Sequence, residues 1–149
     1  MESSQLSRRR VYPTMSKPLD GIKVVEVAAW TFVPAAGAML ADLGAEVIKV
    51  EPPSGDPQRA LRNLLNMSKG GPDPFLELPN RGKRSVTLDL GRDDGRDLLL
   101  EIAGEADVFL TSYLPASRRK LGFDVDAVRA PRGRHLRVRQ RLGRTGPDA

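Results

Sequence analysis

The feature that most constrains this 149-residue chain is the alternation of short apolar runs with helix-forming segments. The first run, residues 22–27, is rich in β-branched side chains, too short for a helix and too apolar for a strand with one wet face. It therefore predicts a buried strand. Similar strand-like runs occupy residues 45–50, 85–90 and 107–110.

Helix formers separate these runs. Residues 34–43 are expected to form a helix, since Pro34 lies in its first turn and Gly44 lies just past its end. One strand, helix and strand of this length cross over right-handedly and make parallel strands. A helix that starts near Asp93 and ends at Gly104 repeats the unit.

The remaining segments complete an α/β pattern. Residues 52–82 are rich in Pro and Gly and are predicted to be a long excursion with one short helix near residues 58–66. Short helices are expected over residues 115–121 and 124–130. The sequence therefore predicts an α/β fold with a Rossmann-like, mostly parallel sheet and helices on both faces.

Composition excludes several classes of function. With no Cys and one His, the chain lacks a disulfide frame, a thiol nucleophile and a His or Cys cluster for a metal. It has no run of about 18 apolar residues and no secretory signal, so we expect no membrane and a cytoplasmic location. The G-x-G-x-x-G and G-K-[ST] loops of dinucleotide and nucleoside triphosphate sites are also absent.

The net charge of +5 is concentrated at the chain ends. Residues 1–17 carry a net +3 and are expected to be a disordered basic tail, whereas residues 131–149 carry +5. The body over residues 18–130 is mildly acidic, with a net charge of −3. Since phosphate binding needs cations gathered on one folded surface, we expect no nucleic-acid partner.

Ligands of an open parallel sheet bind beyond the carboxyl ends of its strands. The loop after residue 110 has hydroxyl groups and the Tyr113 ring, followed by three cations over residues 118–120. This combination suits an adenine ring with phosphates, although a solvated helix face explains the cations equally well. We interpret a second polar cluster as a turn with gatekeeper charges: Asn80, Arg81, Lys83 and Arg84.

Three blocks in order carry a family resemblance: PLDGIKVVEVAAWTFVPAAGAMLADLGAEVIKVEPPSGDPQR, LPNRGKRSVTLDL and ADVFLTSYLPASRRKLGFD. They cover about residues 17–130 and resemble the N-terminal part of family III CoA-transferases, the group of formyl-CoA transferase, carnitine CoA-transferase and α-methylacyl-CoA racemase. The resemblance implies acyl-CoA or CoA as the ligand, bound as a substrate with no other cofactor and no metal. It also implies a homodimer for the full-length family.

The resemblance also implies which positions touch CoA, and all of them follow strands. They are Thr31, Phe32, Leu88, Asp89, Leu90, Gly91, Ser112, Tyr113 and Lys120. Thr31 stands where the family often has Gln, Ser112 stands where a relative has Asn, and Pro52 replaces a basic residue of one relative.

In the transferases of this family an Asp attacks the acyl-CoA thioester, whereas the racemase branch uses a His and Asp pair. Both catalytic positions follow a G-x-G-x-x-G-P segment that this chain reaches only at its end. We therefore expect an N-terminal fragment without the catalytic Asp, inactive by itself. The alternatives are a racemase-like protein or a non-catalytic module that binds CoA or adenine nucleotides.

Residues 131–144 break the apolar pattern, with six Arg in fourteen positions. Leu136 and Val138 alternate with Arg, which allows an edge strand but not a central one, because burying an unpaired Arg costs several kcal/mol. The family has an apolar strand at this place. Our hypothesis is a stretch translated in a shifted reading frame, and the alternative is a degraded copy of that strand.

Overall fold

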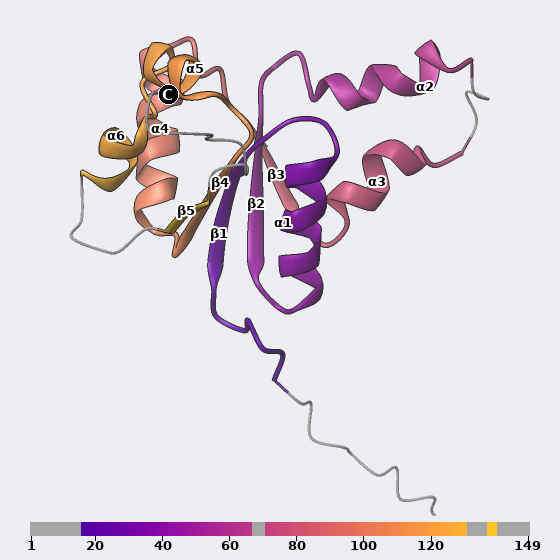
Figure 1. Cartoon of the computed structure of the whole chain (residues 1–149), viewed down its shortest axis with the longest axis horizontal. Helices are drawn as coiled ribbons and strands as arrows, with labels where there is room; N and C mark the ends of the chain where they lie inside the picture. Colours follow the sequence, from indigo (N-terminus) through magenta and orange to yellow (C-terminus); the bar gives the residue numbers. More distant parts are fainter. Residues whose placement is uncertain (1–15, 67–70, 131–136, 140–149) are drawn as a thin grey trace, which may run out of the picture.

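The computed structural model describes residues 16–66, 71–130 and 137–139, with five strands in one sheet of order β3-β2-β1-β4-β5 (Figure 1). All four strand pairings are parallel. The strands are β1 (Lys23–Val27), β2 (Glu46–Glu51), β3 (Arg84–Thr87), β4 (Val108–Thr111) and β5 (Arg137–Arg139). The predicted parallel sheet is confirmed, and β1 to β4 each begin within two residues of the expected start.

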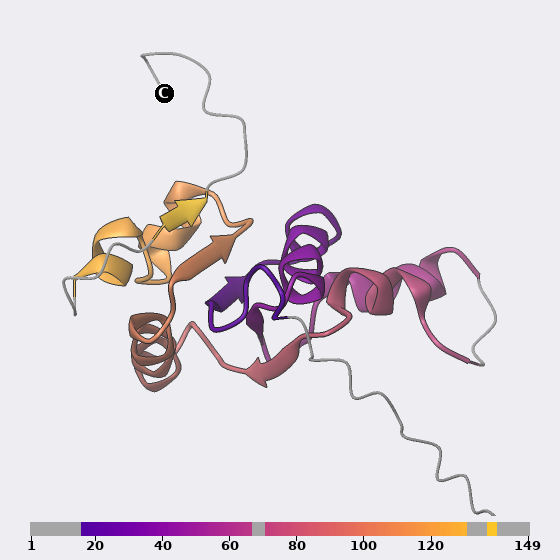
Figure 2. The ribbon, with the colours of Figure 1, turned by 90° about the horizontal axis from the view of Figure 1, so that it is seen from below.

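The sheet is covered on both faces, as predicted (Figures 1 and 2). Helix α1 (Phe32–Asp42) lies on one face with α3 (Pro74–Asn80) packed beside it, and α4 (Asp93–Gly104) and α6 (Val125–Arg129) lie on the other. The excursion between β2 and β3 carries a 3-10 turn η1 (Pro57–Ala60) and α2 (Leu61–Leu64), and α5 (Pro115–Lys120) follows β4. This is the doubly wound arrangement of a Rossmann-like fold.

Apolar side chains alternate between the two faces of the central strands. Val25 and Val27 of β1 pack with Phe109 of β4 against the side chains of α4 and α6, including Leu99 and Val128. Val24, Val47 and Leu110 point to the opposite face, where partly buried residues of α1 pack against them. The sheet is therefore a rigid platform whose carboxyl edge carries the loops of interest.

The excursion over residues 52–82 agrees with the prediction in one element and differs from it in another. The short helix expected near residues 58–66 is present as η1 and α2, whereas α3 was not predicted. The sequence pattern missed α3 because Pro79 lies inside it, although Asp73 caps its start by accepting a hydrogen bond from the Phe75 N–H at 3.1 Å. The pattern overestimated the effect of one proline near a helix end.

Strand β5 lies at the edge of the sheet beside β4, where the alternation of residues 136–139 allowed it to lie. The expectations for residues 1–15 and for most of 131–149 fall outside the described residues. Within the described ranges, every helix is too short or too polar to traverse a lipid bilayer.

Candidate ligand-binding site

The sheet order makes the carboxyl ends of β1 and β4 a topological switch point, the place where folds of this kind bind their ligands. The chain winds outward from β1 to β2 and β3, then returns across the sheet to β4 on the other side of β1. At such a switch point the loops after the two central strands turn to opposite faces and leave room for a ligand. Here the Ala29 N–H donates to Ser112 Oγ at 3.0 Å, which joins the two loops directly.

The loop after β1 presents two aromatic side chains to solvent. Trp30 is 55% exposed and Phe32, the first residue of α1, is 81% exposed. No side chain caps the start of α1, because the Thr31 hydroxyl accepts a hydrogen bond from Gln58 Nε2 at 3.0 Å instead. The loop is thus held from the side by the β2–β3 excursion, and its aromatic rings remain free for contact.

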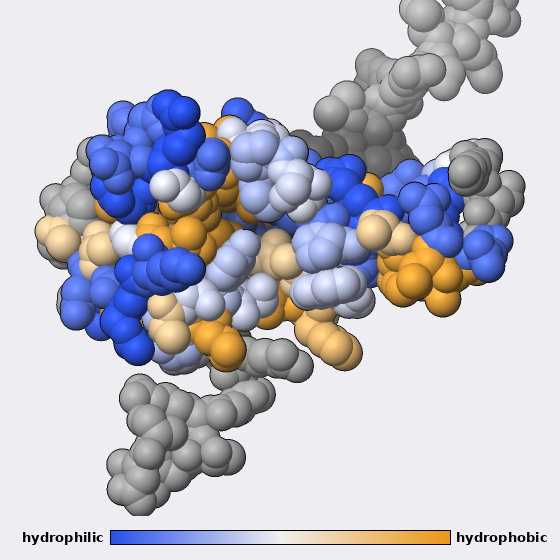
Figure 3. All heavy atoms as spheres, turned by 90° about the horizontal axis from the view of Figure 1, so that it is seen from above, coloured by the Kyte–Doolittle hydropathy of each residue, from blue (hydrophilic) through white to orange (hydrophobic). Residues whose placement is uncertain are grey.

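The loop after β4 combines a half-buried ring with an exposed aliphatic side chain. The Tyr113 ring packs edge-on against Phe123, with ring centroids 5.6 Å apart, and burial raises the pKa of its hydroxyl. Leu114 is 71% exposed. Together with Trp30 and Phe32, it is among the large apolar side chains that the loops after β1 and β4 expose. The face viewed in Figure 3 has apolar patches amid a mostly polar surface.

The other predicted contact residues are two inward-facing leucines, a turn over residues 89–91 and Lys120 at the end of α5. Leu88 is buried in the core and Leu90 packs against that core. Asp89 closes a turn by accepting a hydrogen bond from the Gly91 N–H at 3.0 Å, and this segment follows β3, which β2 and β1 separate from β4 in the sheet. Lys120 is exposed in the last turn of α5. The structure therefore brings the loop of Thr31 and Phe32 against the loop of Ser112 and Tyr113, and it packs Leu88 and Leu90 in the same apolar cluster as Tyr113.

Beneath the loop after β1 lies a buried polar layer that sequence reasoning missed. Lys49 of β2 donates to Asp56 Oδ2 at 2.6 Å and to Asn80 Oδ1 at 2.9 Å, and both members of the Lys49–Asp56 pair are almost fully buried. Asp56 in turn accepts a hydrogen bond from the Trp30 N–H at 3.1 Å. The excursion after β2 therefore connects the interior of the sheet to the ligand edge.

A second buried pair lies beside the first. Lys83 Nζ contacts both carboxylate oxygens of Glu26, at 2.9 and 2.7 Å, and donates to the Pro34 carbonyl at 2.7 Å. Burial raises the pKa of Glu26 and lowers that of Lys83, and the attraction between the two charges opposes both shifts. Gly37 of α1 makes room for the pair, since a Cβ there would lie 1.9 Å from Glu26 Oε2.

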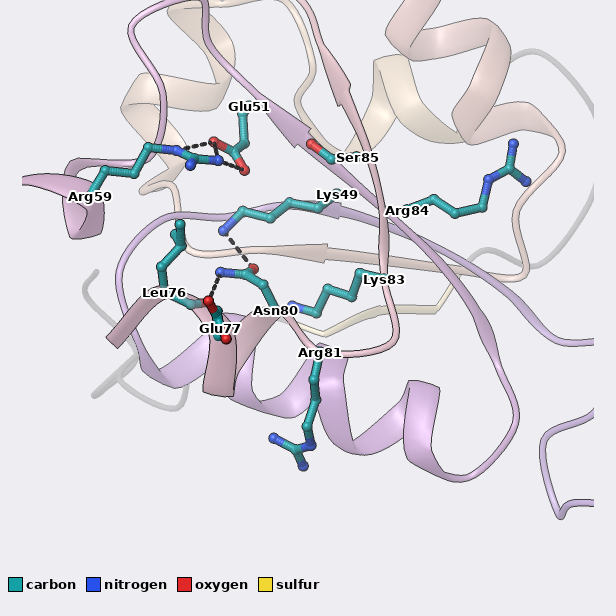
Figure 4. Close-up of a pocket in the computed structure, with 10 residues that line it drawn as sticks. All are labelled: Lys49, Glu51, Arg59, Leu76, Glu77, Asn80, Arg81, Lys83, Arg84 and Ser85. Carbon is teal, nitrogen blue, oxygen red and sulfur yellow. Dashed lines mark hydrogen bonds and ion pairs between the residues drawn. The ribbon is translucent and has the colours of Figure 1, made fainter. Parts of the chain in front are cut away.

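Lys49 and Lys83, the cationic members of the two pairs, line a cleft of about 370 Å³ between β2, β3 and α3 (Figure 4). Figure 4 shows Lys49 reaching toward Asn80 and the bidentate contact of Arg59 with Glu51, which brings Arg59 Nη2 to 2.9 Å from Glu51 Oε2. The cations Lys49, Arg59, Arg81, Lys83 and Arg84 each have a carboxylate partner. The cleft thus has no free positive charge among its lining residues for an anionic ligand.

The interpretation of residues 80–84 as a turn with gatekeeper charges is wrong for two of its residues. Asn80 and Lys83 point inward and bind buried charges, whereas Arg81 and Arg84 form exposed ion pairs with Asp42 and Glu46. The signal that was present in the sequence is a charged residue flanked by apolar ones in each strand, Glu26 in β1 and Lys49 in β2. A charge in a buried strand requires a partner.

The site offers no metal centre among residues 16–66 and 71–130, since no three carboxylate or imidazole side chains there converge as ligands. What the arrangement can do is bind. The loops at the switch point expose apolar and aromatic groups, and hydroxyl and carboxylate groups hold these loops in place.

The sequence of this chain is similar to those of known proteins. The chain matches CoA-transferase family III over residues 19–136. It is 42% identical over 118 residues to the Mycobacterium tuberculosis protein named probable fatty acyl-CoA transferase Rv3272, covering 77% of this chain and 29% of the relative. It is 37% identical over 115 residues to the cinnamoyl-CoA:phenyllactate CoA-transferase of Clostridium sporogenes, covering 74% and 27%.

Solved structures agree with the fold. The crystal structure of the D175A mutant of Rv3272 superposes with a TM-score of 0.72 at 37% identity, over 84% of this chain and 33% of that chain. A CAIB/BAIF family protein from Brucella suis gives a TM-score of 0.67 at 34% identity, over 84% and 33%. The chain thus spans about a third or less of the relatives it matches.

Proposed function

The chain belongs to CoA-transferase family III, and on that premise we propose that its described part is the CoA-binding platform of an enzyme that moves CoA from an acyl-CoA to an acceptor carboxylic acid. One observation carries the proposal. The hydrogen bond between the Ala29 N–H and Ser112 Oγ joins the loops after β1 and β4, and exposed apolar side chains surround that junction.

The chemistry of the relatives supports this substrate class. Relatives of this chain are named for the transfer of CoA between succinate and glutarate, and between succinyl-CoA and D-citramalate. For this protein we propose the same class of reaction, in which a carboxylate oxygen attacks the thioester carbonyl carbon and the C–S bond breaks to release CoA as a thiolate. The thiolate then attacks the enzyme's carbonyl carbon in the resulting anhydride, which releases the donor acid and leaves CoA as an enzyme thioester. The acceptor carboxylate attacks this thioester in turn and displaces the CoA thiolate. The thiolate attacks the acceptor's carbonyl carbon in the new anhydride, which gives the acceptor acyl-CoA and restores the enzyme carboxylate.

The buried carboxylates near the loop after β1 are unsuited to that nucleophilic role. Glu26 and Asp56 are buried and held by Lys83 and Lys49, and Glu51 is buried against Arg59. A carboxylate with its oxygens engaged in this way cannot approach a thioester. We therefore propose that the described residues bind the substrate and that the reacting Asp is not among them.

Calorimetric titration of the purified chain with CoA tests the proposal. We expect saturable binding, and we expect Phe32→Ala to weaken it about tenfold, the effect of losing about 1.4 kcal/mol of contact energy. Met39→Ala is the matched control, because Met39 lies in the same helix, is 61% exposed and is remote from the helix start. No binding by the wild-type chain, or equal losses in the two variants, would refute the proposed site.

A further inference from the structure

The backbone of Trp30 adopts a conformation that is unfavourable for a tryptophan. Its φ angle is 68°, in the left-handed region, which costs a residue with a side chain on the order of 1–3 kcal/mol. The other non-glycine residue with positive φ in the described ranges, Asn66, follows the short helix α2, where such a conformation is common. Trp30 instead precedes a helix, so the surrounding structure must hold it in place.

Three consecutive residues of this loop are anchored from outside it. The Ala29 N–H donates to Ser112 Oγ at 3.0 Å, the Trp30 N–H donates to Asp56 Oδ1 at 3.1 Å, and Thr31 Oγ1 accepts from Gln58 Nε2 at 3.0 Å. The anchors on either side of Trp30 fix the ends of the loop. The Asp56 contact acts on the strained residue itself.

Asp56 is well suited to act as a fixed acceptor. Its Oδ1 also accepts a hydrogen bond from the Gln58 N–H at 2.9 Å, and its Oδ2 accepts from Lys49 Nζ at 2.6 Å. Its side chain is 1% exposed, and that of Lys49 is 2% exposed. A hydrogen bond to a charged acceptor is stronger than one to a neutral acceptor, and the buried Lys49 keeps this carboxylate in one orientation.

We propose that the buried Lys49–Asp56 pair is the positioning device of the ligand site. The pair holds Trp30 in the left-handed conformation, which presents the half-exposed indole where the loops after β1 and β4 meet. This inference rests on the proposed function, because the ligand that meets the indole is the CoA moiety. A ring already held in its binding orientation loses less conformational entropy when the ligand arrives. Asp56 is thus a positioning residue that acts through Trp30.

Trp30 is the single tryptophan of the chain, so its fluorescence reports on this loop alone. The test variant is Asp56→Asn, which keeps the size of the side chain and an oxygen for the Trp30 N–H but removes the charge that binds Lys49. We expect acrylamide quenching of Trp30 to rise about twofold and CoA affinity to fall about tenfold, the range of one charge-assisted hydrogen bond. Asp42→Asn is the matched control, since Asp42 belongs to an exposed ion pair and both quantities should stay at their wild-type values.

Trp30→Gly distinguishes positioning from a general loss of structure. Glycine adopts positive φ without steric cost, so Asp56 has no strain to oppose in that background. Asp56→Asn should then weaken CoA binding in the wild type but add no further loss to Trp30→Gly. The Lys49→Met, Asp56→Asn double variant, which leaves no buried unpaired charge, replaces Asp56→Asn in both backgrounds if the single variant does not fold.

Two results would overturn the positioning role of Asp56. One is that acrylamide quenches Trp30 in Asp56→Asn no more than in the wild type. The other is that Asp56→Asn lowers CoA affinity by the same factor in the wild type and in Trp30→Gly. If the wild-type chain fails to bind CoA while Asp56→Asn still increases quenching, the proposed function is refuted and the positioning of Trp30 is upheld. The quenching data and the titration therefore separate the two proposals.

Discussion

At the scale of single residues, the polar layer under α1 consists of charges that the fold tolerates because each has a partner. Burial disfavours the ionised forms of Glu26 and Lys83, which is why the pKa of the first is raised and that of the second is lowered. Their mutual attraction offsets part of this penalty. Such a pair contributes little net stability but becomes costly when one member is removed.

Glu26→Gln should therefore destabilise the fold by about 3–5 kcal/mol, because Lys83 remains charged and buried without its counter-ion. The Glu26→Met, Lys83→Met double variant should recover most of that loss, since no buried charge remains. Urea denaturation followed by circular dichroism at pH 7 measures both. Glu46→Gln, which breaks an exposed pair with Arg84, is the control and should stay within about 0.5 kcal/mol of the wild type. A loss as small as the control's in Glu26→Gln would show that the pair is not buried as described.

Tyr113 makes the stability depend on pH at the alkaline end. Burial, and secondarily the negative charge of Asp56, raise the pKa of its hydroxyl above the ordinary value of 10.0. The folded state therefore holds this proton more tightly than the unfolded state does. The resulting stability is complete below the unfolded pKa and is lost as pH rises through the folded one.

We expect Tyr113→Phe to lose less stability than the wild type as the pH rises above about 10, because phenylalanine has no proton to release. The measurement is the urea midpoint of both proteins at several pH values. Since all other groups titrate alike in the two proteins, the difference isolates Tyr113. Parallel curves would mean that the hydroxyl is free to ionise in the folded state.

At the scale of elements, α4 and the turn before it fit together through a glycine. A Cβ at Gly95 would lie 2.2 Å from the backbone oxygen of Asp89, so the first turn of α4 packs directly on the turn over residues 88–91. Replacing a helix glycine by alanine normally stabilises a protein by about 0.5–1 kcal/mol. Here the contact is with backbone, which cannot move aside as a flexible side chain does.

Gly95→Ala should thus destabilise the fold by about 1–3 kcal/mol, the range for overpacking, against the usual direction of the substitution. Thermal or urea denaturation measures the change. Gly21→Ala is a useful comparison, because Gly21 has positive φ but nothing within 4 Å of an added Cβ, so it reports the backbone penalty without a clash. A gain in stability for Gly95→Ala would contradict the close approach.

The elements that could be predicted from the sequence are those specified by local patterns. The β-branched runs, the Pro34 start of α1 and the glycine at position 44, with φ 106°, agree with the structure. The helix α3 could not be predicted, since its helical character depends on packing against α1 and on the Asp73 cap in a Pro-containing segment. Local propensity yields to tertiary contacts in such places.

The site was predictable only in part, for the same reason. That loops after strands would meet at one edge follows from parallel topology, and the contact of Ala29 with Ser112 agrees with it. The Glu26–Lys83 contact joins residues 57 positions apart, and a single sequence carries no sign of which charges pair. The strained backbone of Trp30 is likewise imposed by Asp56 from another loop.

At the scale of the whole molecule, the position of β1 in the sheet couples the two halves of the fold. The strands β2 and β3 lie on one side of β1 and β4 lies on the other, so the switch point lies between two units that the chain builds separately. A ligand that contacts both loops must bind the folded state alone, because unfolding separates them. Its binding energy then adds to the stability of the whole sheet.

CoA at about one hundred times its dissociation constant should therefore raise the free energy of unfolding by about 2.7 kcal/mol. Hydrogen exchange can show where this protection lies. The amides of residues 28–31 and 112–114 should slow locally as well as globally, whereas α2, at the far end of the excursion, should gain only the global part (Figure 1). Phe32→Ala should reduce the stabilisation at a fixed CoA concentration, and Met39→Ala should not. Local protection confined to the cleft beside α3 would place the ligand on the wrong side of β1 for this architecture, and would contradict a site that joins its two halves.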